Sequence, residues 1–188
     1  PYGWSKWCVE RVLRDYAAAD PQFAFVSLRY FNVAGAAADG SLGEDHDPET
    51  HLIPVLLLAA LGRRERVTIF GTHYPTPDGT CIRDYIHVED LCAAHAAAMK
   101  ALQPGDQRFY NLGIGQGYSV REVYEAACRV TGMRIPVEYG PRRPGDPAVL
   151  YADPSRIGRE LGWSASYTSL DEIVATAWGW FKDHPNGY

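Results

Sequence analysis

Nine consecutive residues near the start of the chain, Phe23 to Phe31, are apolar or aromatic apart from Ser27 and Arg29. Such a run predicts a strand that is buried on both faces, which occurs almost only in parallel sheets with helices on either side. The preceding residues 2–19 have the periodicity of an amphipathic helix that ends at Asp20-Pro21. A helix feeding directly into a buried strand is typical of an α/β protein.

The rest of the chain alternates between strand-like and helix-like segments. We expect strands at residues 67–70, 83–88, 108–113 and 135–139, with helices before and between them. Ser119-Val-Arg-Glu122 predicts a capping box at one helix start, and Thr168-Ser-Leu-Asp171 predicts a cap for the last helix. Strands that alternate with helices favour parallel pairing and an α/β fold.

The composition argues against several classes of protein. The chain has 188 residues and a net charge of −5 with no basic run, so we expect no nucleic-acid partner and no anionic membrane surface. No apolar run approaches the roughly 18 residues of a membrane span. The four cysteines show neither CxxC nor Cys/His spacing, which predicts unpaired thiols in a cytoplasmic protein and no metal site.

Tyr2 and Lys6 stand four residues apart and should share one face of the first helix. A tyrosine hydroxyl is ordinarily a poor base at neutral pH, and a nearby ammonium group favours the phenolate. The pair is therefore a candidate for proton transfer. The same spacing is common by chance, and most such pairs are surface residues without a catalytic role.

Polar residues in three other segments are candidates for binding a ligand. Asn32 follows the buried strand, at the carboxyl end where α/β proteins bind ligands, although an Asn there also suits a turn. Arg83 follows a Pro/Gly-rich loop and suits a diphosphate, unless it is paired internally in the Arg83–Asp84 region. Arg143 and Asp146 lie in an Arg-Arg-Pro-Gly-Asp loop that either grips phosphate and ribose or forms a solvated turn.

The order of these features resembles the UDP-glucose 4-epimerases, which are extended short-chain dehydrogenase/reductases. The similarity covers the whole chain and includes Pro-Tyr-Gly-x-Ser-Lys, Leu-Arg-Tyr-Phe-Asn, His-Leu-Ile-Pro and Arg-Arg-x-Gly-Asp. Its most specific part is Tyr-Pro-Thr-x-Asp-Gly-Thr-x-x-Arg-Asp-Tyr-Ile-His-Val, at residues 74–88. The family's Gly-x-Gly-x-x-Gly loop has no counterpart, since the spacing in residues 113–117 is different.

The resemblance implies reversible C4 epimerisation of UDP-glucose and UDP-galactose by transient hydride transfer to bound NAD. Tyr2 would act as the proton acceptor, Lys6 would bind the nicotinamide ribose, and Phe31 would contact NAD. The residues implied to bind the UDP-hexose are Asn32, His51, Leu52, Thr68, Ile69, Phe70, Arg83, Arg143, Asp146 and Leu150.

Two of these residues depart from, or vary within, the family pattern. His51 replaces an expected asparagine, but an imidazole is still able to donate to a phosphate. Leu150 stands where some members have a tyrosine and others a small residue. Its intermediate size predicts some tolerance of N-acetylhexosamine substrates.

The resemblance also divides the chain into two domains. Residues 1–35 and 81–115 would belong to the C-terminal part of a Rossmann-type parallel sheet that binds NAD, and residues 36–80 and 116–188 to a smaller α/β domain that binds the UDP-sugar. The glycine-rich loop, ribose-binding acid and catalytic Ser/Thr of the family would lie in an N-terminal half upstream of Pro1. We therefore expect a fragment that is inactive alone and a homodimer in the full-length form.

Other functions remain compatible with the sequence. Another extended short-chain reductase acting on nucleotide sugars, such as a 4,6-dehydratase or a uronate epimerase, shares the more general motifs. A non-catalytic nucleotide-sugar-binding module is the alternative from a different class. The joint presence of Tyr2, Lys6, Asn32, Arg83 and Arg143 favours an enzyme.

Overall fold

A computed structural model describes residues 1–188. The six helices are α1 (Tyr2–Ala19), α2 (Leu52–Ala60), α3 (Val88–Ala101), α4 (Val120–Thr131), α5 (Ser155–Leu161) and α6 (Leu170–Asp183). The nine strands are β1 (Phe25–Arg29), β2 (Asn32–Ala34), β3 (Val67–Phe70), β4 (Ile82–Arg83), β5 (Tyr85–His87), β6 (Gln107–Asn111), β7 (Tyr118–Ser119), β8 (Val137–Gly140) and β9 (Val149–Leu150).

The strands form four small sheets in which parallel pairing dominates. β1 pairs with β6, β2 with β5 and β3 with β8, all in parallel. β4 lies between β9, which is parallel to it, and β7, which is antiparallel. Parallel neighbours require crossover connections, and helices supply these here. The expected α/β class with parallel strands is confirmed.

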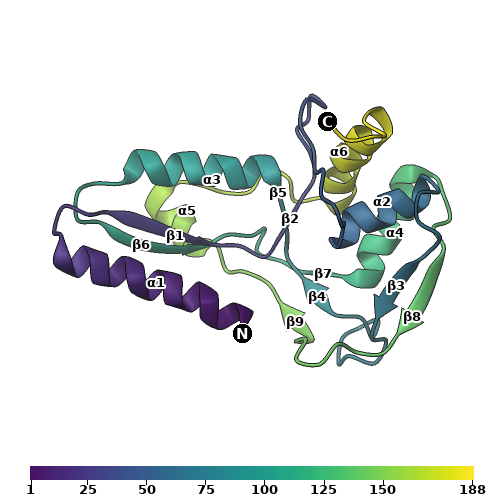
Figure 1. Cartoon of the computed structure of the whole chain (residues 1–188), viewed down its shortest axis with the longest axis horizontal. Coiled ribbons are helices and arrows are strands. Elements are labelled where there is room, and N and C mark those ends of the chain that lie inside the picture. Colours follow the sequence, from purple (N-terminus) through teal and green to yellow (C-terminus); the bar gives the residue numbers. More distant parts are fainter.

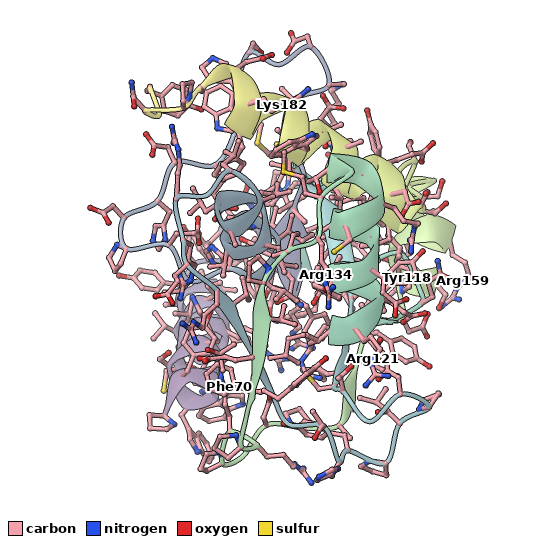
Figure 2. The ribbon with its side chains drawn as sticks, turned by 90° about the vertical axis from the view of Figure 1, so that its right-hand side faces the viewer. Phe70, Tyr118, Arg121, Arg134, Arg159 and Lys182 are labelled. Carbon is pink, nitrogen blue, oxygen red and sulfur yellow. The ribbon has the colours of Figure 1, made fainter.

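Two groups of elements lie side by side along the long axis (Figure 1). In one group, α1 and α3 lie on opposite sides of the β1–β6 pair, and α5 packs against β6 and α3. In the other, α2, α4 and α6 pack together beside β3 and β8, and Figure 2 shows α4 and α6 at the outer end of this group. β2, β5, β4 and β9 run between the groups, so residues at their ends are able to contact both.

The core is divided in a similar way. The larger apolar cluster joins the inner faces of α2, α4 and α6, and Trp180 and Ile173 are among its fully buried members. The smaller cluster joins β5, α3 and β6, and Ile157 and Trp163 bring α5 and the residue segment after it into this cluster. The division into domains 1–35/81–115 and 36–80/116–188 remains a prediction, and it did not anticipate that α5 packs with the first group.

The first strand is shorter and less buried than the sequence predicted. β1 covers only Phe25–Arg29, and Phe25 is its only fully buried residue. β6 is the only strand that pairs with it, so the remaining side chains stay partly accessible. Arg29 turns outward and forms an ion pair with Glu10 of α1, at 2.5 Å.

Of the two predicted helix caps, one is confirmed and one is wrong. The Ser119 hydroxyl accepts a hydrogen bond from the Glu122 amide at 3.0 Å, and the Glu122 carboxylate accepts one from the Ser119 amide at 2.7 Å, which completes a capping box. At α6 the N-cap residue is Ser169, whose side chain makes no cap hydrogen bond. Asp171 instead forms an ion pair with Arg129 of α4 at 2.7 Å, so its carboxylate is drawn away from the helix end.

None of the helices combines the length and apolarity that crossing a membrane would demand.

Candidate functional site

A cavity of about 490 Å³ opens between the second group of elements and the strands that connect it to the first. Nine of the residues that the sequence singled out line this cavity: Asn32, His51, Leu52, Thr68, Ile69, Phe70, Arg83, Arg143 and Asp146. They come from β2, β3, β4, the start of α2 and the loop after β8. Only tertiary packing brings these segments together, because they are spread over more than a hundred residues of sequence.

Arg83 and Asp146 form a largely buried ion pair in the cavity wall. The side chain of Arg83 is 13% exposed and that of Asp146 is 27% exposed. The Arg83 guanidinium also donates to the carbonyl oxygens of Pro147 at 2.8 Å and of Ile82 at 2.6 Å. The Tyr74 hydroxyl donates to the second Asp146 oxygen at 3.3 Å. The alternative that Arg83 is paired internally therefore holds, although the pair is largely buried: its partner is Asp146, from the Arg-Arg-Pro-Gly-Asp loop.

Arg143 is the cation that remains available to a ligand. Its guanidinium carbon lies 4.2 Å from the centre of the Phe70 ring, and it makes no ion pair. Stacking on an aromatic face holds a guanidinium in place while leaving its N–H donors free. Because the cavity also has apolar walls, including Val55, Val67 and Ile69, it suits a ligand with both a flat apolar part and an anionic part.

Asn32 is held in place by the backbone of Asp84. Its side-chain amide donates to the Asp84 carbonyl oxygen at 3.1 Å, and its backbone amide donates to the same oxygen at 3.3 Å. The parallel pairing of β2 and β5 places Asn32 opposite Tyr85, which is buried and also lines the cavity. The position at a strand end, which the sequence predicted, thus directs Asn32 toward the cavity.

The side chain of Asp84 is buried and joins three segments. One carboxylate oxygen accepts the Ile114 amide and the other accepts the Ala152 amide, both at 3.1 Å. Burial raises the pKa of Asp84, and the two amide hydrogen bonds oppose that shift. Gly113 has to be glycine here, because a Cβ at this position would overlap Asp84 Oδ2. Gly113, the first glycine of residues 113–117, therefore serves this contact.

His51 lies at the N-terminus of α2, on the rim of the cavity. Its Nδ1 lies 2.5 Å from a Glu44 oxygen and 3.2 Å from a Glu49 oxygen. Burial, followed by the charge of Glu49, raises the pKa of Glu44, while His51 opposes the shift. Since Nδ1 is engaged by carboxylates, Nε2 is the nitrogen through which His51 would meet a ligand.

Four predicted site residues do not line the cavity. Tyr2 and Lys6 share a face of α1 as expected, with the Lys6 ammonium 5.2 Å from the centre of the Tyr2 ring, but Tyr2 is 75% exposed. Phe31 follows β1 and is 36% exposed. Leu150 of β9 pairs with Arg83 of β4 and is 39% exposed. None of these residues forms part of the cavity wall.

Comparison with known proteins decides the family. Residues 1–113, more than half of the chain, match the model of the NAD dependent epimerase/dehydratase family. The chain belongs to this family.

Individual members of the epimerase/dehydratase family are similar over the full chain. A UDP-glucose 4-epimerase of Halalkalibacterium halodurans is 50% identical over 189 residues, which is all of this chain and 56% of the relative. The crystal structure of UDP-glucose 4-epimerase from Bifidobacterium longum, in complex with NAD⁺ and UDP, superposes with a TM-score of 0.94 at 44% identity and covers 100% of this chain and 56% of that one.

The name of a third relative includes two substrates. The UDP-Glc/GlcNAc 4-epimerase of Campylobacter jejuni is 46% identical, with a TM-score of 0.77, over 97% of this chain and 56% of that one. The chain thus spans about half the length of the relatives it matches. Its Rossmann-type character follows from these superpositions.

Several residues that line the cavity in this family member were not anticipated. They are apolar residues of β2, α2, β3 and α4, together with Glu49, Thr50, Arg64, Cys81 and Tyr85. Arg64 had a weak signal, because it belongs to a Gly-Arg-Arg sequence after a helix. Tyr85 is part of the motif at residues 74–88 and Cys81 occupies one of its variable positions, but a buried phenol and a buried thiol are ordinarily core residues.

Replacing Asp84 by Asn should destabilise the chain by about 2 kcal/mol. The Asn side chain has one acceptor oxygen for two backbone amides, so one buried donor loses its partner. Urea denaturation followed by circular dichroism measures this. Asp153→Asn is the matched control, because the exposed Asp153 accepts a single amide, that of Ser155 at 2.9 Å, and Asn preserves that bond. Equal losses for the two variants would contradict the role assigned to Asp84.

Proposed function

We propose that this chain is the C-terminal part of an enzyme that interconverts UDP-glucose and UDP-galactose by epimerisation at C4. The observation that carries the proposal is the convergence of nine residues, from five separate segments, on one cavity. The relatives at up to 50% identity carry the name UDP-glucose 4-epimerase. The structure of the Bifidobacterium longum relative contains NAD⁺ and UDP.

The cavity would bind the UDP part of the substrate firmly. Thr68, Ile69 and Phe70 lie along one strand. Their polar groups would bind the edge of the uracil, and the Phe70 ring would contact its face. Arg143, which stacks on Phe70, is free to bind the diphosphate, and His51 at the start of α2 would donate to it through Nε2, since Nδ1 is engaged by carboxylates. Arg83 would act chiefly by fixing Asp146, since its own donors already have protein partners.

Tyr2, Lys6 and Phe31 would hold the nicotinamide end of NAD. Tyr2 and Lys6 are exposed on one face of α1, and such an accessible pair fits a ribose and a reacting hydroxyl. NAD supplies the acceptor and donor of the C4 hydride. Tyr2 would take the proton of the 4-hydroxyl and later return it, while Lys6 would bind the nicotinamide ribose. These residues offer only part of an NAD site, so the 188-residue chain alone should neither retain NAD nor epimerise.

The hexose region is proposed to accept N-acetylated sugars to some degree. Leu150 is next to Arg83 across the β4–β9 pair and is smaller than a tyrosine. The Campylobacter jejuni relative, described as a UDP-Glc/GlcNAc 4-epimerase, supports this substrate range.

A cytoplasmic location is proposed as well, because all four cysteines are free thiols.

UDP binding to the chain tests the cavity directly. Arg143→Gln removes a charged donor from the diphosphate and should weaken UDP binding about 10-fold, as measured by isothermal titration calorimetry. Arg134→Gln is the matched control: this exposed arginine, labelled in Figure 2, lies outside the cavity and should bind UDP like the parent chain. Unchanged affinity in Arg143→Gln, or no UDP binding at all, would contradict the proposed site.

The assay of epimerase activity requires the chain to be extended by an N-terminal half. The corresponding half of the Halalkalibacterium halodurans relative is suitable. The extended protein should convert UDP-galactose to UDP-glucose, and Tyr2→Phe should lower kcat by about 100-fold or more because the proton acceptor is lost. The unextended chain should show no turnover. UDP-N-acetylgalactosamine is assayed in parallel, and absence of turnover with it would exclude the substrate range assigned to Leu150. Binding of UDP-glucose without turnover would support a non-catalytic module instead.

A homodimer is proposed for the extended protein, with part of α1 in the interface. The exposed apolar residues of this helix include Trp4, Trp7, Val9, Val12 and Tyr16. Only Ala17 of α1 is buried in the chain, and such a large apolar helix surface favours a cover, either the N-terminal half of the extended protein or a second copy of it. Sedimentation of the extended protein at micromolar concentration should give the mass of a dimer, and a monomer would contradict the proposal.

A further inference from the structure

The loop before α2 gathers two histidines and two glutamates within eight residues. Ligand atoms of His46, Glu49 and His51 all lie within 4.8 Å of one another. Glu49 Oε1 lies 3.2 Å from His51 Nδ1 and 3.9 Å from His46 Nδ1. Glu44 adds an oxygen 2.5 Å from His51 Nδ1, and the two imidazole rings lie 5.4 Å apart.

Glu49 holds the centre of this group in a fixed position. Its side chain is only 7% exposed, although it is charged and sits on a loop. Its Oε1 accepts the backbone amides of Thr50 at 2.6 Å and of His51 at 2.7 Å, while Oε2 has no hydrogen-bond partner. Oε1, the oxygen nearest the two imidazoles, is thus held by the backbone, and Oε2 of the same carboxylate is left to bind a cation.

We propose that His46, Glu49 and His51 form a binding site for a divalent cation of the Zn²⁺ type, with the carboxylate of Glu44 nearby to balance its charge. Tetrahedral Zn²⁺ with ligands at about 2.1 Å places its ligand atoms roughly 3.4 Å apart. The contacts of Glu49 with the two imidazoles, at 3.2 and 3.9 Å, are close to that spacing. Two nitrogens with carboxylate oxygens favour Zn²⁺ over Mg²⁺ or Ca²⁺, which prefer oxygen alone.

The site departs from the sequence-based expectation that the chain has no metal site. That expectation rested on the cysteines, whose spacing is wrong for a metal. The histidines and glutamates are spaced at positions 44, 46, 49 and 51 along a non-helical loop, which is not a recognisable ligand pattern. The loop's own turns bring them together.

A protonated His51 between Glu44 and Glu49 would explain some of the same contacts without a metal. His46 separates the two explanations. It is half exposed, and the one carboxylate within 4.0 Å of it is Glu49 at 3.9 Å, which is too far for a hydrogen bond. Removing His46 should therefore hardly affect a proton-bridged cluster, whereas it removes one ligand of a metal site.

The cation would sit at the rim of the cavity. Glu49 and His51 both line the cavity, and three protein ligands leave a tetrahedral ion one coordination position. An anionic group in the cavity is thus expected to bind more tightly when the metal is present. This consequence, unlike the metal site itself, rests on the proposed binding of a UDP-sugar.

Calorimetric titration of the metal-free 188-residue chain with Zn²⁺ tests the site. We expect one equivalent to bind with a dissociation constant on the order of micromolar or tighter, and much weaker binding of Mg²⁺ and Ca²⁺. His46→Gln should weaken Zn²⁺ binding at least about 10-fold. His73→Gln is the matched control, since His73 is exposed and outside the group, and it should bind like the parent chain. Equal binding by His46→Gln and the parent would overturn the proposal.

Two further measurements exclude simpler explanations. A synthetic peptide of residues 42–53 should bind Zn²⁺ at least about 10-fold more weakly than the chain, because only the fold fixes Glu49. Equal affinity would mean that the structure builds no site. Co²⁺ in place of Zn²⁺ should give the visible absorption of a tetrahedral site, and an octahedral spectrum unaffected by His46→Gln would also overturn the proposal.

The link to the nucleotide is measured separately. UDP titrated into Zn²⁺-loaded and metal-free chain should bind more tightly to the loaded form, and His46→Gln should remove the difference. If Zn²⁺ binds and UDP does not, the metal site stands and the proposed function fails. If UDP binds and Zn²⁺ does not, the metal site fails and the proposed function stands.

Discussion

Asp84 stands between β4 and β5 with its side chain almost fully buried, and each of its carboxylate oxygens accepts one backbone amide. One amide belongs to Ile114, beyond the end of β6, and the other to Ala152, beyond the end of β9. The Asp84 carbonyl receives both amide donors of Asn32. A single residue therefore ties the first group of elements to the strands that border the cavity. An unpaired buried carboxylate would be costly, so these segments have little freedom to move apart.

The charges around the cavity are arranged in two different ways. Arg83 and Asp146 satisfy each other in the wall, and they fix the loop after β8 against β4. Arg143, only three residues from Asp146, lies over Phe70 and keeps its donors free. Asp146 and Arg143, which lie in the same loop, thus have different roles: Asp146 fixes the loop to Arg83, and Arg143 is available for binding. On the opposite rim, Glu44 and Glu49 with His46 and His51 create a locally negative region that suits a cation.

The extent to which the sequence predicted this site depends on the kind of contact. Thr68, Ile69 and Phe70 were predicted from the family resemblance, and one short strand places them together because its residues are consecutive. The partner of Arg83 was not predictable from local sequence, because Asp146 lies 63 residues away and the adjacent Asp84 looked like the simpler partner. The need for glycine at position 113 was not predictable either, because it depends on the Asp84 carboxylate, which lies far away in the sequence. The overestimated burial of the first strand has a similar cause, because burial depends on how many strands pair with it.

The sequence by itself determined the α/β class, the order of the elements and the Ser119 capping box, and its motifs named nine of the 21 residues that line the cavity. These follow from periodicity, local hydrogen bonds and motif order, all of which are properties of neighbouring residues. Only the tertiary structure decided which of those residues share a cavity, that Arg83 is engaged while Arg143 is free, and that Tyr2 and Lys6 lie outside the cavity wall. It also brought the imidazoles and carboxylates of residues 44–51 within ligand distance of one another. Such pairings depend on crossover connections and loop turns, whose geometry is set by packing rather than by any local pattern.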